Sequence, residues 1–386
     1  MRFFGFKKKE PSAAAAPNKK RTDAPSLGHL NGLFQGSASS GAVRFEDGFE
    51  TDHRCDWKKV SAAVQAAIQR DATYSDLVVS KKGGGLRYIS IPGRHTATIQ
   101  RQILSKVDSQ DYVNPHAYAY IPGRSVVECA EQHGQAKWLI KVDLRDFFHF
   151  IDEKMVYLEF RRRGVRKFQA FVLARIVTRS PRFEDEGYHS LPSKYKRNRW
   201  SIVRSPRWQE SNHRLGYLPQ GAPASGAISN LVCYRLDQDI AQLALVHKLT
   251  YTRYGDDLVL SDTSPFRREF AEAILHLVIR AVHQSGFEIN KEKTRIIPPG
   301  ARLKVLGLLV GDKGLRLQRS FKTKLDHQLY LISKFGFSES QVGKAKKLEP
   351  QELANQLLGR LLWARQVEPE WAKVRIHRLQ RLYEAS

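Results

Sequence analysis

Two adjacent carboxylates lie in a short polar break between two apolar runs. Asp256 and Asp257 end the tetrapeptide Tyr-Gly-Asp-Asp, with Leu-Thr-Tyr-Thr-Arg before it and Leu-Val-Leu-Ser after it. Apolar runs on both sides of a glycine-containing turn predict a β-hairpin with the carboxylates at its tip. Mg²⁺ prefers a few hard carboxylate oxygens and takes further ligands from water and substrate phosphates. The hairpin is therefore a candidate magnesium site, although the tetrapeptide alone is equally typical of an aspartate-rich turn.

A second acidic site follows another apolar run. Residues 138–142 (Trp-Leu-Ile-Lys-Val) predict a strand that delivers Asp143, and two aromatic residues come soon after it. Nucleotidyl transfer by two metal ions needs carboxylates that converge from separate strands, so that the ions clamp the attacking and leaving oxygens. We therefore predict Asp143 and Asp256 as catalytic metal ligands, and Asp257 as a further catalytic carboxylate beside Asp256.

A segment rich in proline and glycine separates the two acidic sites. Residues 215–230 predict a turn that opens onto a helix, with Ser225 near the helix start. Gln220 and the glycine-rich backbone suit close approach to a nucleotide and a template. Alone, the segment is typical of any loop-to-helix junction; its place between Asp143 and the aspartate pair gives it functional weight.

In this order, the three segments resemble motifs A, B and C of a reverse transcriptase palm, specifically of the bacterial retron-type group. The resemblance covers about residues 57–386 and follows the order of the family's motifs. Further segments resemble the fingers, motif D, the primer grip and the thumb of that group: 81–92 with 100–104, 120–125, 286–294, 303–307, and 358–365 with Pro369.

The resemblance implies an α+β fold of the right-hand polymerase type, with an antiparallel-sheet palm backed by helices. We expect fingers over residues 56–137, a palm over 138–310 and a helical thumb over 311–386, where apolar residues recur every three to four positions. Residues 1–55 are rich in Lys, Pro, Ala, Ser and Gly, which predicts a basic flexible tail. Residues 180–213 form a basic, aromatic insertion within the expected palm.

The charge of the chain agrees with a nucleic-acid partner. Its 64 Lys and Arg residues against 39 Asp and Glu give a net charge of +25. Such an excess attracts polyanions, although it would also describe a basic protein that binds RNA nonspecifically. In the insertion, Lys194, Lys196, Arg197 and Arg199 alternate with aromatic residues, a pattern suited to stacking on unpaired bases. These residues are RNA-binding candidates, and a charged outer face of a β-hairpin is the alternative.

Several side chains have roles that the resemblance implies. Lys81 and Arg87, on the expected fingers hairpin, would bind the incoming triphosphate, and Gln220 would contact the nucleotide. Phe148 would lie under the sugar, where a 2′-hydroxyl would clash. Lys293 would protonate the departing pyrophosphate, a role that requires reach and a suitable pKa. A solvent-exposed surface lysine is the alternative for Lys81 and for Lys293.

Phe148 and Gly255 indicate different classes of polymerase. An aromatic residue at position 148 is common in reverse transcriptases, whereas Tyr-Gly-Asp-Asp is common in RNA polymerases and retron-type enzymes more often carry Ala at position 255. We give Phe148 more weight, because Ala and Gly both fit a tight turn. The chain is therefore expected to use deoxynucleotides.

The implied function is RNA-directed DNA polymerisation of the retron type. With two Mg²⁺ ions and dNTP substrates, the enzyme would copy part of a structured noncoding RNA into short single-stranded DNA (msDNA), passing through an RNA–DNA hybrid. The setting would be phage defence, with a possible effector or toxin protein as partner. His133 belongs to an element resembling the Asn-Ala-x-x-His of retron enzymes, and is an RNA-binding candidate with a structural histidine as the alternative.

Departures from the retron pattern leave two other functions open. Cys129 replaces Asn, Leu306 replaces Thr, and Gly226 also differs from the usual residue. One alternative is another defence-associated or group II-like reverse transcriptase without a branched product. The other is a catalytically inactive RNA-binding module, against which the three aspartates and Gln220 argue.

The cysteines and the apolar runs of the sequence indicate where in the cell the protein is located. The three cysteines are far apart, with no pattern of a metal site or a disulfide framework, which indicates a reducing compartment. No apolar run reaches the length of about 18 residues needed for a membrane span, and the first residues do not resemble a signal peptide. We expect a cytoplasmic protein with no membrane partner.

The sugar-gate assignment predicts the phenotype of Phe148→Ala. Removing the ring should relax selection against ribonucleotides, because the 2′-hydroxyl would no longer meet it. Single-nucleotide incorporation with matched dNTP and rNTP measures this ratio, and unchanged discrimination would contradict the assignment.

Overall fold

The structure is a computed structural model that describes residues 74–80, 86–107, 113–179, 216–311, 314–339 and 349–384. The expected tail over 1–55, the insertion over 180–213 and Lys81 lie outside these residues. The described helices and strands are, in chain order, β1 (Tyr74–Ser80), β2 (Leu86–Pro92), α2 (Arg94–Val107), α3 (Val126–Glu131), β3 (Trp138–Asp143), α4 (Phe147–Phe150), α5 (Glu153–Arg162), α6 (Lys167–Val177), α10 (Ser225–Val232), α11 (Tyr234–Val246), β4 (Thr250–Tyr254), β5 (Asp257–Asp262), α12 (Arg268–Gln284), β6 (Arg295–Ile297), β7 (Lys304–Val305), β8 (Leu308–Leu309), α13 (Arg319–Glu339), α15 (Pro350–Arg365) and α16 (Pro369–Glu384).

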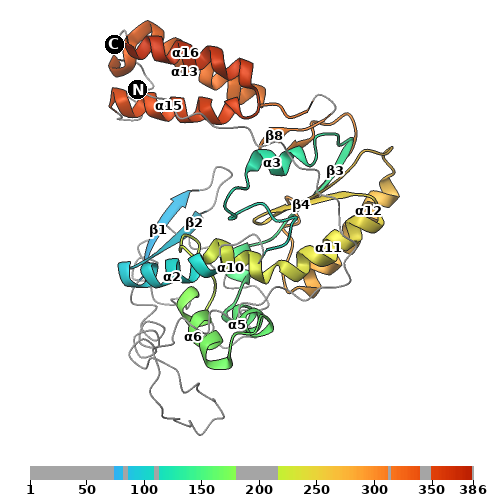
Figure 1. Cartoon of the computed structure of the whole chain (residues 1–386). Helices are drawn as coiled ribbons and strands as arrows, with labels where there is room; N and C mark the ends of the chain where they lie inside the picture. Colours follow the sequence, from blue (N-terminus) through green and yellow to red (C-terminus); the bar gives the residue numbers. More distant parts are fainter. Residues whose placement is uncertain are drawn as a thin grey trace, which may run out of the picture.

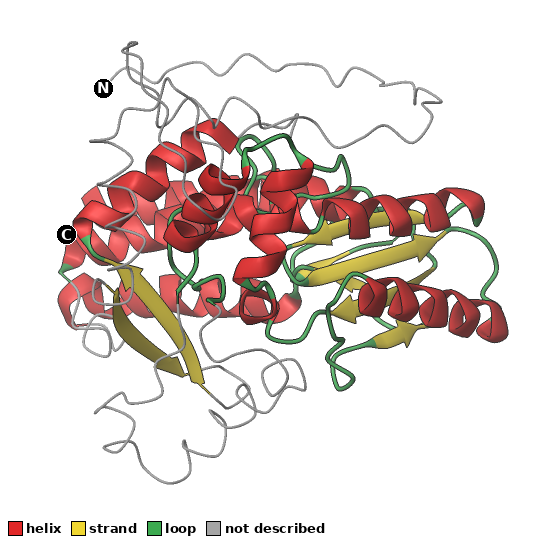
Figure 2. Cartoon of the chain, turned by 90° about the horizontal axis from the view of Figure 1, so that it is seen from below, coloured by secondary structure: helices red, strands yellow, loops and turns green. Residues whose placement is uncertain are grey.

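A four-stranded sheet carries the predicted carboxylates (Figures 1 and 2). Its strand order is β4, β5, β3, β6, and every neighbouring pair is antiparallel. The predicted hairpin is confirmed, with β4 and β5 joined at Gly255 and Asp256. The predicted strand ending at Asp143 is also confirmed, and it is the central strand β3, rich in the apolar side chains that pack well on a pleated sheet.

Alternation along β3 separates the hydrophobic core from the acidic residues. Ile140 and Val142 are fully buried in the large core that they share with α5, α6, α10, α11 and α12. Leu139 is on the opposite face, in a smaller cluster with α3 and the β7–β8 hairpin. Because side chains alternate between faces, Asp143 lies on the Leu139 face, and its cross-strand partner Asp257 lies there too. The carboxylates therefore occupy the face away from the main core.

The β1–β2 hairpin stands apart from the sheet and is fixed to the loop before α10 (Figure 2). The Ser90 amide donates to the Gln220 carbonyl at 2.7 Å. A Cβ at Gly221, where φ is +109°, would lie 2.5 Å from Ile89 Cγ2, so only glycine permits this approach. The Arg179 guanidinium also bonds to Asp76 of β1 and to the Ser90 hydroxyl. These contacts place β2 beside Gln220.

The C-terminal helices α13, α15 and α16 pack around a core of their own, at one end of the molecule in Figure 1. The amphipathic pattern predicted after residue 311 is confirmed, since Leu325, Leu329, Leu353 and Leu357 are all fully buried there. Ala364 and Ala372 join the cluster on the Leu139 face of the sheet, so the helical unit rests on that face. Within the described residues, no helix combines the length and the apolarity that a bilayer crossing demands.

Candidate active site

A cavity of about 1100 Å³ lies beside the end of β3 and the β4–β5 turn. Its lining residues come from the β2 strand, β3, α4, the loop before α10, the hairpin turn and the segment before β6. Most of the predicted site residues described by the structure line it: Arg87, Asp143, Phe148, Gln220, Asp256 and Lys293. Asp257 is not among the lining residues. It begins β5 and lies on the same face of the sheet as its cross-strand partner Asp143. Groups as far apart in the chain as Arg87 and Lys293 thus share one opening.

Backbone hydrogen bonds fix the two lining carboxylates relative to each other. The Leu144 amide donates to the Asp256 carbonyl at 2.9 Å, and the Asn290 amide donates to the Asp143 carbonyl at 2.7 Å. Gly255 opens the turn with φ of +64°, a conformation in which any L side chain is strained. The interpretation that alanine and glycine fit this turn equally well is therefore wrong for this backbone.

Negative charge accumulates at the end of β3. Burial, together with the charges of Asp257 and Asp143, raises the pKa of Asp256 to about 6. Burial and Asp143 also raise the pKa of Asp257, against the opposing effect of Lys141. The ionised forms of Asp256 and Asp257 are thus disfavoured beside Asp143, and a cation would stabilise them.

Lys293 supplies one positive charge to this site. Its Nζ lies 3.1 and 3.2 Å from the two carboxylate oxygens of Asp143. Burial alone would lower the pKa of Lys293, but the hydrogen bond and charge of Asp143 raise it above its usual value. The predicted general acid is thus paired with a predicted metal ligand.

The carboxylates that line the cavity suit a magnesium ion that takes its remaining ligands from water and substrate. Among the described residues, no group of three or more His, Cys, Asp or Glu side chains is placed to enclose a metal ion. Mg²⁺ commonly binds through one or two carboxylates and takes its other ligands from water and phosphate oxygens. Asp143 and Asp256, both facing the cavity, fit that mode.

The other walls of the cavity contain the remaining candidates. Arg87 is exposed on β2, across from the carboxylates. Phe148 is half-buried, with its ring centroid 5.3 Å from that of Phe147 and 5.9 Å from that of Tyr120. Phe147 is buried in the core. Ser225 begins α10 and its hydroxyl donates to the Pro219 carbonyl at 2.6 Å, which orders the loop that carries Gln220.

The structure does not support an RNA contact at His133. This side chain is 1 % exposed, and its Nδ1 and Nε2 lie 2.7 Å from Ser261 Oγ and 2.8 Å from Thr252 Oγ1. Burial lowers its pKa to about 4, so the ring is neutral. His133 holds the end of α3 against β4 and β5, as the structural alternative states. Lys81, Lys194, Lys196, Arg197 and Arg199 lie outside the described residues.

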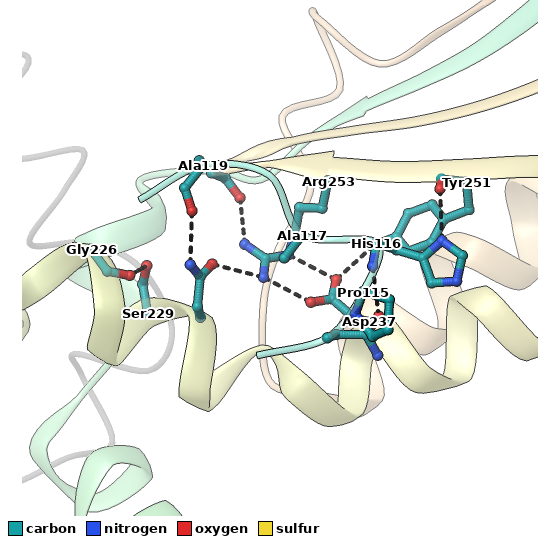
Figure 3. Close-up of polar contacts among 12 residues, drawn as sticks. Pro115, His116, Ala117, Ala119, Gly226, Ser229, Asp237, Tyr251 and Arg253 are labelled. Carbon is teal, nitrogen blue, oxygen red and sulfur yellow. Dashed lines mark hydrogen bonds and ion pairs between the residues drawn. The ribbon is translucent and has the colours of Figure 1, made fainter. Parts of the chain in front are cut away.

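A buried ion pair joins the last strand residues before the β4–β5 turn to α11 (Figure 3). Arg253 and Asp237 are both fully buried and joined by two hydrogen bonds, of 2.8 Å from Nε and 2.7 Å from Nη2. The same guanidinium donates to Asn230 Oδ1 at 3.0 Å and to the Gly255 carbonyl at 3.2 Å. Although burial opposes its charge, Asp237 raises the pKa of Arg253 above its usual value. The positive charge is therefore permanent and anchors the turn to α10 and α11.

Hydrogen bonds from the same network also hold residues 116–119, which precede α3. The Arg253 amide donates to the His116 carbonyl, and the Tyr118 amide donates to the Arg253 carbonyl, both at 2.8 Å. Asn230 Nδ2 donates to the Ala119 carbonyl at 2.8 Å. The path of residues 116–119 is thus set by β4 and α10, as Figure 3 shows for the labelled residues.

Comparison with known proteins agrees with this arrangement. The family described as reverse transcriptase (RNA-dependent DNA polymerase) matches residues 79–310, more than half of the chain. The chain belongs to the reverse transcriptase family. Its matched span contains all the described cavity residues, from Arg87 to Lys293.

Among curated proteins, the chain is similar to several bacterial retron reverse transcriptases. It is 32 % identical over 262 residues to the retron Mx65 reverse transcriptase of Myxococcus xanthus, covering 68 % of this chain and 56 % of the relative. It is also 32 % identical over 248 residues to the retron Mx162 reverse transcriptase of the same organism, covering 62 % and 48 %. The chain thus spans about half the length of these relatives.

A solved structure of telomerase from Candida albicans, in complex with a TWJ fragment of telomeric RNA, matches 88 % of this chain and 68 % of its own. The TM-score is 0.44 and the sequence identity is 9 %.

Sequence reasoning missed three residues that shape the site. Arg253 and Asp237 lie 16 positions apart on a strand and a helix, and nothing in their spacing shows that they pair. Tyr120 belongs to a segment that resembles a fingers motif, but its place in the cavity depends on how residues 116–119 are held.

The buried His133 predicts a specific acid sensitivity. Its pKa is about 4 in the folded protein and 6.5 when unfolded, so the unfolded chain binds more protons between these values, and stability falls as pH falls through this window. The loss amounts to about 3 kcal/mol at most. Denaturant unfolding at pH values from 7 to 4 measures the free energy of unfolding. As the pH falls, this free energy should decrease more for the wild type than for His133→Gln, by up to that amount. The exposed His377→Gln serves as control, and parallel pH curves for wild type and His133→Gln would contradict the prediction.

The Arg253–Asp237 pair predicts a non-additive stability pattern. Arg253→Met or Asp237→Leu should each lower the free energy of unfolding by about 3–5 kcal/mol, because either leaves a buried charge without its partner. Arg253→Met combined with Asp237→Leu should cost less than the sum of the two single losses. Urea unfolding measures these differences. In the matched control, Arg268→Met breaks the exposed Arg268–Glu272 pair of α12 and should cost under about 1 kcal/mol; equal losses at the two pairs would refute the assignment.

Proposed function

We propose that this chain is a retron-type RNA-directed DNA polymerase that copies part of a structured noncoding RNA into short single-stranded DNA. The observation that carries the proposal is the shared cavity. It combines one carboxylate at the end of β3 and one in the β4–β5 turn with an arginine, an aromatic ring and a glutamine among its lining residues. Phosphoryl transfer depends mainly on positioning and charge neutralisation, which are what this arrangement provides.

Asp143 and Asp256 would hold two Mg²⁺ ions, with Asp257 supporting them from the same face. When bound, the ions would stabilise the attacking 3′-oxygen and the leaving pyrophosphate. Lys293, which is paired with Asp143 in the structure, would donate a proton from its ammonium group to the pyrophosphate oxygen when Asp143 holds the metal. The reach of Lys293 to Asp143 supports this role, because the two groups already share the same end of the cavity.

Arg87 binds the triphosphate from β2, and Gln220 contacts the nucleotide from the loop before α10. The hydrogen bond from the Ser90 amide to the Gln220 carbonyl fixes the position of β2, which carries Arg87, relative to the loop that carries Gln220. Phe148 faces the sugar. In this reading, residues 56–137 are the fingers, 138–310 the palm and 311–386 the thumb. The helices α13, α15 and α16 grip the RNA–DNA hybrid against the sheet.

The template and primer would be a structured noncoding RNA, as the resemblance of the sequence to retron-type enzymes implies. The DNA product would be msDNA, made in the cytoplasm in the setting of phage defence and with an effector or toxin protein as a further partner. Lys194, Lys196, Arg197 and Arg199 remain proposed RNA contacts, and Lys81 a proposed triphosphate contact.

Polymerase activity is tested by extension of a primed RNA template with dNTPs and Mg²⁺. The wild type should extend the primer, and Asp256→Asn should lower the rate by at least about 100-fold, because the reaction loses a charged ligand at the transition state. Asp239→Asn, which removes an exposed carboxylate of α11, should leave the rate unchanged. Chelation of Mg²⁺ by EDTA should abolish extension. RNA binding without extension by the wild type would favour the inactive RNA-binding module.

The retron assignment is tested by expressing the chain with the noncoding region beside its gene and sequencing the nucleic acid that copurifies. A short DNA joined 2′–5′ to a defined RNA, absent with Asp256→Ala, would support the retron type. DNA without this branch would favour another defence-associated or group II-like reverse transcriptase.

A further inference from the structure

Tyr120 lies at the meeting point of the elements that form the cavity. It lines the cavity, and its side chain is 48 % exposed. Its φ is +60°, an uncommon conformation for a residue other than glycine. Strained backbone of this kind persists where surrounding contacts fix it, and it is concentrated at functional sites.

Neighbouring hydrogen bonds hold the Tyr120 backbone. Asn230 Nδ2 bonds to the Ala119 carbonyl just before it, and the Arg253 carbonyl accepts from Tyr118. The buried Arg253 network therefore determines the position of the Tyr120 ring as well as that of the turn.

Gly226 shows how closely the Tyr120 ring is seated. A Cβ at Gly226 would lie 2.6, 2.7 and 2.9 Å from Cγ, Cβ and Cδ1 of Tyr120. Gly226 is the second residue of α10, where glycine costs about 0.5–1 kcal/mol relative to alanine. The helix has the less favourable residue because the Tyr120 ring fills the space of a methyl group. This contact gives a physical reason for the glycine found at position 226.

The far edge of the ring faces the catalytic turn and the gate residue. A Cβ at Gly255 would lie 3.4 Å from the Tyr120 hydroxyl, which is ordinary van der Waals contact. On the other side, the Tyr120 and Phe148 rings are 5.9 Å apart at an angle of 59°. Together they form one aromatic wall between the turn and α4. Within the described residues, the Tyr120 hydroxyl makes no hydrogen bond, so it is available to a ligand in the cavity.

We propose that Tyr120 is a specificity-determining residue that, with Phe148, forms the wall against the sugar of the incoming deoxynucleoside triphosphate. This inference rests on the proposed polymerase function. Phe148 alone could turn away from a 2′-hydroxyl, because its own contacts leave it half-buried. The Tyr120 ring, held against Gly226 and 5.9 Å from the Phe148 ring, opposes that movement and so keeps the wall closed to a 2′-hydroxyl.

The test compares single-nucleotide incorporation of matched dNTP and rNTP. Tyr120→Ala should lower the ratio of their kcat/KM values by about tenfold or more, the range expected when a pocket loses a group that excludes one substituent. Tyr120→Phe keeps the ring and should retain the wild-type ratio. Tyr118→Ala, in the same segment but outside the cavity, is the matched control and should also retain it. Both substrates are measured on one enzyme preparation, so the ratio does not depend on the folded fraction.

Coupling to the gate residue is tested by the double variant. If the rings act as one wall, Tyr120→Ala with Phe148→Ala should lower discrimination by less than the product of the two single effects. Tyr120→Leu replaces Tyr120→Ala if the latter incorporates neither nucleotide.

The seating of the ring has its own test. Gly226→Ala should reduce incorporation in the wild-type background and reduce it less beside Tyr120→Ala, because the methyl group then occupies the vacated space. A wild type that extends primers while the Tyr120 variants keep the full dNTP preference would overturn the specificity role and leave the polymerase proposal intact. A wild type with no extension would overturn the polymerase proposal itself.

Discussion

The buried pair of Arg253 and Asp237 is the interaction on which the site depends. Neither side chain reaches solvent, so each charge requires the other, and the remaining donors of the guanidinium are directed to Asn230 and the Gly255 carbonyl. A guanidinium is planar and cannot be deprotonated in proteins, which suits it to hold several acceptors in a fixed geometry. The pair ties the hairpin turn to α10 and α11, and through Asn230 to the segment that ends at Tyr120. The position of the turn that carries Asp256 is therefore set by the buried polar cluster of Arg253, Asp237 and Asn230.

The sheet explains why so much polar chemistry is tolerated near a well-packed core. One face of β3 places its apolar side chains in the large helical core, while the other carries Leu139 and Asp143 towards α3 and the C-terminal helices. The hydrophobic cover of this second face stops short of the strand ends. His133, Thr252 and Ser261 satisfy one another farther along the same face, where it is closed to solvent. At the end that stays open, the carboxylates meet the cavity.

Charge at that open end is balanced only in part. Asp143 is paired with Lys293, while Asp256 has a pKa raised to about 6 and would favour a cation over its own ionised, unpaired form. In the proposed mechanism, a cation would replace the Lys293 ammonium beside Asp143 at low cost, because the carboxylate oxygens are already in place. Arg87 and Gln220 are also positioned in advance, because a backbone hydrogen bond joins the β2 strand to the loop before α10.

The sequence by itself determined the elements and the acidic residues. Apolar runs around a glycine turn specified the hairpin, the strand before Asp143 followed from its apolar residues, and leucines spaced three to four apart specified the C-terminal helices. These features are local, because periodicity and turn chemistry act between residues close in the chain. Tertiary structure decided the rest: that Arg253 meets Asp237, that His133 is buried rather than exposed to RNA, and that Tyr120 enters the cavity above Gly226. Each of these depends on which faces of distant elements come together, and no short-range pattern in the chain records that.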